Sequence, residues 1–451
     1  MTTARFYDYG KLYLSAARYD EYRPETIYEA QSQICAVLKV GNSVRVWAGG
    51  NSMSGAALPR KDETLLRLKG LNHYRFEIPG TISVGVGAML WDVRDMLETF
   101  NYVLPVYNGG RGAPSVGGFI NAGGVGACRR LDFLPEGVAK ERAGLGYQSL
   151  DSRIDSSGEE IYLDVEGYKG LSELHGGFWE NVMSVTLIDG MGERRVIERG
   201  HDDFPWLFGS YGQLGVMVEA TLRIIPSEEA LKPTYPLGQS GRVALNQPED
   251  SQFSNSAPTS GGMEHLYWMS YAVSVEQEQK AWSELAEMVP RHMPYVKPVS
   301  GFVGPRGQNG KPIGYRYFVT HKEFHPPLLY PRPEDFVLMG VMAIVNVGKA
   351  SFDRQLLAFG KDFVEIATRN NFCLYMQAEN TGRWLDYETY YSADVYAHFK
   401  TLKQKYDPEN RINPGVFFDR VKDTPQLAYQ ARRQIGTLAQ LFSISDAAKN
   451  D

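Results

Sequence analysis

The sequence contains few cysteines, no long apolar run and no long basic run. Its 3 cysteines, Cys35, Cys128 and Cys373, lie far apart without the spacing of a metal site, so we expect reduced thiols and no metal. No segment approaches the roughly 18 apolar residues that a membrane helix needs. The first residues lack the apolar region of a secretory signal. These absences predict a cytoplasmic protein without a membrane span.

The charge balance is mildly acidic, with 47 Lys and Arg against 53 Asp and Glu and a formal net charge of −6. Nucleic-acid binding usually needs a basic patch, so we expect no nucleic-acid partner. Hydrophobic residues make up 43% and charged residues 22%, as in soluble globular proteins. With 451 residues the chain exceeds the size of one hydrophobic core, which predicts two domains.

Two glycine-rich segments carry the strongest local signal. Five glycines fall between residues 117 and 126, and they are interleaved with Val116, Phe119, Ile120 and Val125. Flexible linkers are polar, so this pattern indicates a backbone pressed closely against another surface. A second segment, 44–55, is a short apolar strand that runs into a glycine turn. Two such loops predict a large, planar, anionic ligand such as a dinucleotide.

The usual phosphate-binding patterns are missing. No Gly-x-Gly-x-x-Gly stands between a strand and a helix with an acidic residue downstream, which argues against a Rossmann fold. The P-loop pattern is also missing. Apolar periodicity instead predicts α+β mixing over the first half, with helices at 24–39 and 90–100 and strands at 44–47, 65–68, 75–78, 82–86, 182–188 and 195–197. Pro24 suits a first helical position.

The periodicity also predicts how the chain divides. Residues 1–227 form one domain, within which the polar stretch 129–177 is expected to be a lid or an insert. Residues 228–404 form a second domain with an antiparallel sheet covered by helices, entered through a Pro-, Ser-, Gln- and Gly-rich crossing. Residues 405–451 return to the first domain and end in a helical tail after Pro425.

Four segments taken in order resemble the FAD-linked oxidase family, the vanillyl-alcohol oxidase or p-cresol methylhydroxylase type. They are the glycine turn 48–55, the segment 114–118, the Asp-Gly turn at 189–190 followed by 208–216, and the segment 407–415. Each alone is a weak signal, because a glycine is often only a tight turn. The resemblance covers about the first 226 residues well and the middle domain in outline.

The resemblance implies a two-part FAD-binding domain followed by a substrate-binding cap domain. It implies that backbone N–H groups at 49–52 hold the pyrophosphate, that Gly117 and Gly118 allow close approach of the flavin, and that Val216 and Val218 flank the adenine. The full set of residues that it assigns to the cofactor is Gly49, Gly50, Asn51, Ser52, Met53, Ser54, Pro114, Ser115, Gly117, Gly118, Gly123, Gly212, Gly215, Val216, Val218 and Asn413.

One departure from the family pattern concerns covalent attachment. Many relatives carry a histidine after the paired glycines of the first loop, and that histidine bonds to the flavin. Asn51 stands there in this chain, and an amide is no comparable nucleophile. We therefore predict non-covalent FAD. Cys128 is the alternative tether, because bicovalent relatives attach a cysteine from this general region; its other interpretation is a small buried hydrophobe.

The candidate catalytic residues lie in the second domain. Tyr375, Gln377 and Glu379 alternate, so on a strand all three face the same way. A buried Glu379 is a candidate base, and the Tyr375 hydroxyl is a candidate partner for the reacting oxygen. Tyr391 follows on a loop, as does Tyr390. A solvent-facing strand surface is the alternative interpretation of the trio. The resemblance to decaprenylphosphoryl-ribose oxidases is incomplete, because Ala378 stands where they carry a lysine.

Three other polar residues, His321, His325 and Arg316, are further candidates for the site. His321 and His325 have the i,i+4 spacing of metal ligands, but the prolines that follow disfavour a helix, so a loop histidine near the substrate is the preferred interpretation. Arg316 is either an anion-binding residue or a surface arginine.

The leading hypothesis is a flavin enzyme that oxidises an alcohol, amine or C–H group of a small organic substrate by hydride transfer to flavin N5, in keeping with secondary metabolism. One alternative is a dehydrogenase or reductase that passes electrons from a sugar- or sterol-like substrate to an acceptor other than oxygen. The other is a redox-inactive binding subunit. The substrate, the electron acceptor and the oligomeric state do not follow from the sequence.

Overall fold

The computed structural model describes most of the chain between Tyr19 and Val416. The described residues are 6–7, 13–15, 19–52, 55–77, 80–106, 114–126, 153–154, 160–161, 176–226, 264–292, 296–298, 303–306, 312–319, 321–346, 350–375, 391–416, 418 and 426–427. The expected mixture of helices and sheets is confirmed. The predicted domain limits, and the lid or insert at 129–177, stay predictions.

The first sheet is parallel and has three strands, in the order β3 (Asp20–Tyr22), β5 (Glu63–Arg67) and β4 (Ser43–Trp47). Helix α1 (Ile27–Lys39) precedes β4 and buries Ala30, Ile34 and Val37. The prediction that the helix starts at Pro24 is wrong. The Thr26 hydroxyl accepts the Glu29 N–H at 3.1 Å, and this N-cap starts the helix at Ile27.

The second sheet is antiparallel and has five strands. Their order is β12 (Arg194–Glu198), β11 (Val182–Ile188), β13 (Val216–Arg223), β7 (Thr81–Gly85) and β6 (Tyr74–Phe76). The hairpin predicted around the Asp-Gly turn is present, because β11 pairs antiparallel with β12. Helix α2 (Leu90–Thr99) follows β7, and a small pair of strands, β8 (Tyr102–Val103) and β14 (Ile225–Pro226), lies beyond it.

The glycine-rich stretch after Pro114 is partly helical rather than a loop throughout. Helix α3 (Val116–Asn121) begins at Val116, because Ser115 is its N-cap: the Ser115 hydroxyl accepts the Gly118 N–H at 3.3 Å. Gly123 then turns the chain with a φ of +67°. The described residues of this half also form three short 3₁₀ turns, η1 (Leu68–Gly70), η4 (Phe178–Asn181) and η5 (Phe204–Leu207).

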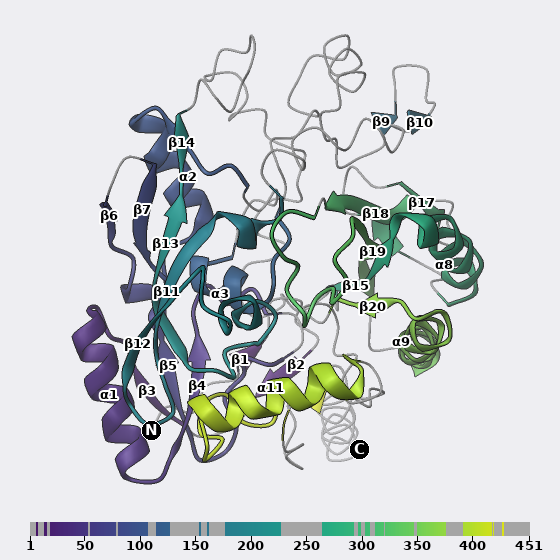
Figure 1. The fold of residues 1–451 in the computed structure, drawn as a ribbon. Coiled ribbons are helices and arrows are strands. Elements are labelled where there is room, and N and C mark those ends of the chain that lie inside the picture. The colour runs from purple at the N-terminus through teal and green to yellow at the C-terminus, as the bar shows by residue number, and fades with distance from the viewer. Residues whose placement is uncertain are drawn as a thin grey trace, which may run out of the picture.

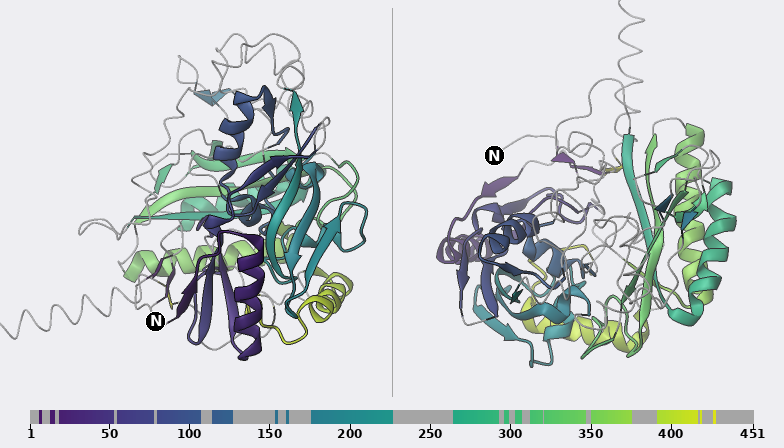
Figure 2. Two further views of the ribbon diagram at one scale, coloured as in Figure 1. Left: turned by 90° about the vertical axis from the view of Figure 1, so that its left-hand side faces the viewer. Right: turned by 90° about the horizontal axis from the view of Figure 1, so that it is seen from above.

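The third sheet is antiparallel and belongs to the second half of the chain. It runs β17 (Val303–Arg306), β18 (Pro312–Val319), β19 (Phe336–Asn346), β15 (Glu264–Ser274) and β20 (Cys373–Leu374), and β16 (Val296–Pro298) also pairs with β19. Helices α8 (Glu278–His292) and α9 (Ala350–Asn370) cover its outer face (Figure 2). Tyr271 of β15 stacks on Phe363 of α9 with ring centroids 3.8 Å apart, so sheet and helices share a packed core.

Helix α11 (Ala393–Tyr406) carries the chain back to the first half (Figure 1). The residues after it run beside β4, where the Val44 N–H donates to the Arg411 carbonyl and the Asn413 N–H donates to the Val44 carbonyl, both at 2.8 Å. Beyond them, β21 (Gln426–Leu427) joins β1 (Phe6–Tyr7) and β2 (Tyr13–Ser15). Strand β21 stands where the predicted helical tail begins, and the rest of that tail lies outside the described residues.

Two further described features are the 3₁₀ turn η7 (Val275–Gln277), which follows β15, and a two-stranded pair, β9 (Arg153–Ile154) and β10 (Glu160–Ile161). Within the described ranges, no helix has the length and apolar content needed to cross a bilayer.

Candidate functional site

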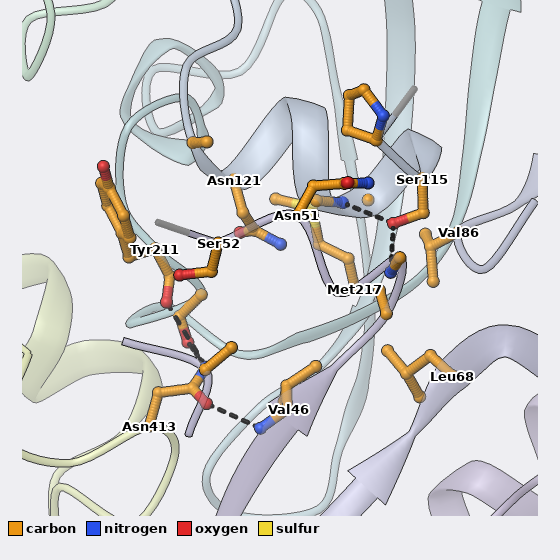
Figure 3. A pocket seen from close by; sticks show the side chains of 18 of the residues that line it. Val46, Asn51, Ser52, Leu68, Val86, Ser115, Asn121, Tyr211, Met217 and Asn413 are labelled. Atoms are coloured by element: carbon orange, nitrogen blue, oxygen red, sulfur yellow. Dashed lines mark hydrogen bonds between the residues drawn. The ribbon is translucent and has the colours of Figure 1, made fainter. Parts of the chain in front are cut away.

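The glycine-rich segments meet around one cavity of about 860 Å³, a volume that includes the space at its open mouth (Figure 3). Twelve of the residues predicted to contact a cofactor lie on its wall: Gly49, Gly50, Asn51, Ser52, Pro114, Ser115, Gly117, Gly118, Gly212, Gly215, Val216 and Asn413.

Four predicted cofactor residues are not placed on this wall. Val218 is fully buried within β13, and Gly123 packs against Gly209, where a Cβ on Gly123 would meet the Gly209 nitrogen at 3.1 Å. The fold therefore uses both residues for packing. Met53 and Ser54 lie outside the described residues.

Gly49 joins the first glycine turn to the segment before α3. Its N–H donates to the Ser115 hydroxyl at 3.0 Å, and a Cβ on Gly49 would lie 2.7 Å from the Ser115 backbone nitrogen. Because this N–H already donates to a protein group, it is not available to a pyrophosphate. Of the N–H groups expected to hold the pyrophosphate, those of residues 50–52 are left. The glycine at position 49 is required by contact between two loops.

Asn413 joins the C-terminal segment to two walls of the cavity (Figure 3). Its side-chain Oδ1 accepts the Val46 N–H at 2.9 Å, and its Nδ2 donates to the Gly212 carbonyl at 3.2 Å. A Cβ on Gly212 would lie 2.7 Å from that Nδ2, and Gly212 has a φ of +68°. Because the amide bonds both to strand β4 and to the turn at 211–214, Asn413 fixes the shape of the cavity.

A buried ion pair lies directly behind the wall. Arg45 is fully buried and binds Glu63 through two hydrogen bonds, at 2.6 and 2.9 Å. The same guanidinium donates to the Ala56 carbonyl at 2.9 Å and to the Pro414 carbonyl at 2.8 Å. Ala56 lines the cavity, and Pro414 follows Asn413. Arg45 thus holds the first loop and the C-terminal segment together.

A second buried ion pair fixes the C-terminal segment itself. Lys403 donates to the Asp407 carboxylate at 2.7 Å and to the Gln213 carbonyl at 3.1 Å. Asp407 also accepts the Ile412 N–H at 2.8 Å, and a Cβ on Gly190 would lie 2.3 Å from it. The Asp-Gly turn and the segment 407–415 therefore touch directly.

The wall carries unpaired polar atoms and no charge. The Oγ of Ser52 and the Oδ1 of Asn121 are buried and have no hydrogen-bond partner among the described residues. No lysine, arginine, aspartate or glutamate is among the described residues that line the cavity. Buried polar atoms normally find a partner, so these two atoms are suited to receive polar groups of a ligand.

Sequence reasoning missed several wall residues. They include Val46, Leu68, Val86, Asn121, Tyr211 and Met217. Asn121 stands inside the glycine-rich stretch, and its position at the end of the short helix α3 is what turns it toward the cavity. The apolar members come from strands and turns whose own patterns show burial but not which surface they cover.

The two candidate catalytic residues that the structure describes, Tyr375 and Tyr391, do not line this cavity. Tyr375 is 3% exposed, and its N–H donates to the Ser270 carbonyl at 3.0 Å, with its ring 5.8 Å from that of Trp268. Tyr391 is also buried. Neither is among the described lining residues. Gln377, Glu379 and Tyr390 lie outside the described residues, as does Cys128.

His321 and His325 lie together in a segment that is not helical. Their ring centroids are 4.8 Å apart, and His325 is enclosed by Phe336, whose ring centroid lies 4.9 Å away. The His325 Nε2 lies 2.7 Å from the Glu334 carbonyl oxygen. Within the described residues there is no group of three or more His, Cys, Asp or Glu that could hold a metal ion. This geometry is that of a histidine packed in an aromatic core.

This packing predicts acid sensitivity. Burial lowers the pKa of His325 to about 4, with His321 adding to the shift and the Glu334 carbonyl opposing it. Between the ordinary pKa of about 6.5 and pH 4 the unfolded state binds the extra proton, so stability falls as the pH falls through this window. The expected loss is about 3 kcal/mol.

The measurement is urea unfolding of wild type and His325→Phe at pH 7 and pH 4. We expect the stability difference between the two proteins to shift by about 3 kcal/mol in favour of the variant at pH 4. A difference that does not change with pH would contradict the buried neutral histidine.

Comparison with known proteins gives the class of protein. A family model described as an FAD binding domain matches residues 22–134, from β3 to beyond α3. This is the FAD-binding domain of the p-cresol methylhydroxylase type, found in the FAD-linked oxidase family, and the chain carries it. The predicted resemblance is therefore confirmed. No curated protein matches the chain.

The residues of the cavity fit this cofactor. FAD carries hydroxyl, amide and pyrophosphate groups, and the wall offers the two unpaired polar atoms of Ser52 and Asn121 together with a glycine turn. Such neutral backbone and side-chain groups hold phosphates in many proteins without a lysine. Members of this family are generally FAD oxidoreductases, and an FAD-binding domain indicates a flavin-dependent oxidoreductase.

Proposed function

We propose that this protein is an FAD-dependent oxidase or dehydrogenase that oxidises an alcohol, amine or C–H group of a small organic substrate. The observation that carries the proposal is that four segments remote in sequence converge on one cavity whose described lining residues carry no charge, in a chain with an FAD-binding domain. FAD, when bound, supplies the redox chemistry by accepting a hydride at its N5 atom.

The roles of the protein residues follow from their chemistry. The N–H groups of residues 50–52 and the Ser52 hydroxyl hold the pyrophosphate, and Asn413 keeps the surrounding wall in place. On the substrate side, the Tyr375 hydroxyl hydrogen-bonds the reacting oxygen and the Glu379 carboxylate takes the proton. Gln377 and Tyr391 orient the substrate. These substrate-side roles rest on the sequence pattern.

The bound FAD is proposed to be non-covalent, because Asn51 offers no nucleophile to the flavin. The test is the visible spectrum of purified protein, measured again on the supernatant after acid precipitation. Release of the yellow colour supports non-covalent FAD, and bleaching by alcohols or amines would then identify a substrate class. Colour retained in the pellet contradicts the proposal for Asn51 and directs attention to Cys128. A colourless protein that FAD does not restore contradicts the enzyme function.

Removing the unpaired atoms of the wall is expected to affect the apoprotein and the FAD complex in opposite directions. Ser52→Ala and Asn121→Leu remove buried polar atoms that have no partner among the described residues. We expect the apoprotein to keep or gain stability, since an unsatisfied buried acceptor is costly. FAD affinity is expected to fall about tenfold for each change, because a hydrogen bond to the ligand is lost.

Titration of apoprotein with FAD, followed by flavin fluorescence, measures the affinity, and thermal melting of the apoprotein measures the stability. A variant that loses apoprotein stability while binding FAD normally would show that these atoms serve the fold and not the cofactor.

A further inference from the structure

Strand β6 is an edge strand of the five-stranded sheet, at the outer margin of the molecule (Figure 1), and no other strand among the described residues pairs with its outer side. The Gly85 N–H donates to the His73 carbonyl at 2.8 Å, and the Glu77 N–H donates to the Thr81 carbonyl at 3.4 Å. In an antiparallel ladder, residues whose backbone groups bond to the neighbouring strand alternate with residues whose backbone groups point away from it. The backbone groups of the intervening residues 74 and 76 therefore point away from β7, as a template for another strand.

Aromatic side chains extend the core past this edge. Tyr74 and Phe76 stand opposite Val84 and Ile82, which are fully buried, so both aromatic residues lie on the core face of the sheet. They are nevertheless 53% and 40% exposed. Phe100, at the end of α2, is 56% exposed and lies 5.3 Å from Phe76 between ring centroids. The core face thus ends in an uncovered aromatic cluster.

The opposite face of β6 carries one charge of each sign. Arg75 donates to the Glu77 carboxylate at 3.0 Å, and both side chains are substantially exposed. Edge strands are usually protected from pairing by charged side chains, commonly lysine, and like charges that face each other across a new strand pair repel. On this edge the two charges offset each other, so a partner strand with the same pattern meets no net repulsion.

We propose that β6 pairs antiparallel with β6 of a second copy of this chain, with Phe76 opposite its counterpart on a two-fold axis. The outward backbone groups at 74 and 76 allow only registers with a residue on the axis. With the axis at Arg75, the arginines of the two copies face each other and repel. With the axis at Glu77, the two glutamates do the same. An axis at Tyr74 places Arg75 opposite His73, which supplies no negative charge.

The axis at Phe76 is the register that the charges favour. It places Arg75 opposite Glu77 of the second copy, and by symmetry Glu77 opposite Arg75 of the second copy. The exposed faces of Phe76 and Phe100 then cover one another across the axis, and the sheet continues from one copy into the next. Because β6 has only 3 residues, the interface is small, and the dimer is expected to dissociate on dilution.

The test is sedimentation velocity of the full-length protein across the micromolar range. Wild type is expected to pass from monomer to dimer. Glu77→Arg should weaken the dimer about tenfold or more, because two cross-strand pairs change from attractive to repulsive. The double change Arg75→Glu with Glu77→Arg should restore it, since it exchanges the charges within each pair. Tyr28→Lys is the matched control, because Tyr28 is an exposed aromatic residue on α1, away from this edge.

Three results would overturn the proposal: a monomer at every concentration, a dimer that Glu77→Arg leaves unchanged, or a charge exchange that fails to restore dimerisation. If Glu77→Arg does not fold, Phe76→Lys tests the same axis, with circular dichroism to show that the variant is folded. A folded Phe76→Lys protein that still dimerises like wild type also overturns it.

Discussion

Replacing Arg45 by methionine is expected to lower the free energy of unfolding by about 3–5 kcal/mol, because it leaves Glu63 buried without its partner. Arg45 is fully buried, and its guanidinium makes two hydrogen bonds to Glu63. After the change, the Glu63 carboxylate keeps the Arg60 N–H, at 2.8 Å, as its remaining described donor. Urea unfolding of the apoprotein measures the loss.

The control is the double variant Arg45→Met with Glu63→Leu. Removing both charges is often close to neutral, so most of the lost stability is expected to return. FAD affinity is not expected to return, because the hydrogen bonds to the Ala56 and Pro414 carbonyls stay lost and these anchor two parts of the cavity wall. Full recovery of FAD binding in the double variant would show that Arg45 does not shape the site.

Replacing Gly49 by alanine is expected to weaken FAD binding by about tenfold to a hundredfold, which corresponds to overpacking by about 1–3 kcal/mol. The new Cβ would lie 2.7 Å from the Ser115 backbone nitrogen and 3.3 Å from its Cβ. The two loops must then separate, and the hydrogen bond from the Gly49 N–H to the Ser115 hydroxyl is lost. Fluorescence titration of apoprotein with FAD measures the effect.

Gly200→Ala is the matched control, because a Cβ at Gly200 would meet no atom within 4 Å. Neither glycine has a positive φ, so the backbone tolerates alanine at both positions and only the space around the Cβ differs. We expect Gly200→Ala to bind FAD like wild type. Equal affinity for both variants would contradict close contact between the two loops as a requirement of the site.

Local elements followed closely from the sequence because local forces decide them. Strand β11 begins and ends where its apolar run predicted, at Val182 and Ile188, and the Asp-Gly turn after it forms the expected hairpin. The start of α1 did not follow, because the Thr26 hydroxyl competes with Pro24 as a start signal and caps the helix. Short helices such as α3 are also poorly marked, since two turns carry little periodicity.

The glycine motifs by themselves determined that a dinucleotide-binding domain is present, and the match over residues 22–134 confirms the domain. The sequence shows where the glycines stand and in what order the glycine-rich segments follow one another. It does not show what each glycine contacts. Only the tertiary structure decided that Gly49 touches Ser115, that Gly117 faces Val86, and that Asn413 closes the wall.

The buried charges show the same division. Arginine and lysine are normally exposed, so nothing in the sequence marked Arg45 or Lys403 as interior. Their partners, Glu63 and Asp407, and the carbonyl groups that satisfy them come together only when remote segments fold onto β4 and α11. Composition and motif order therefore determined the class of cofactor, because they depend on residue types. The shape of the cavity was decided by long-range packing, because its walls come from chain segments that no local pattern connects.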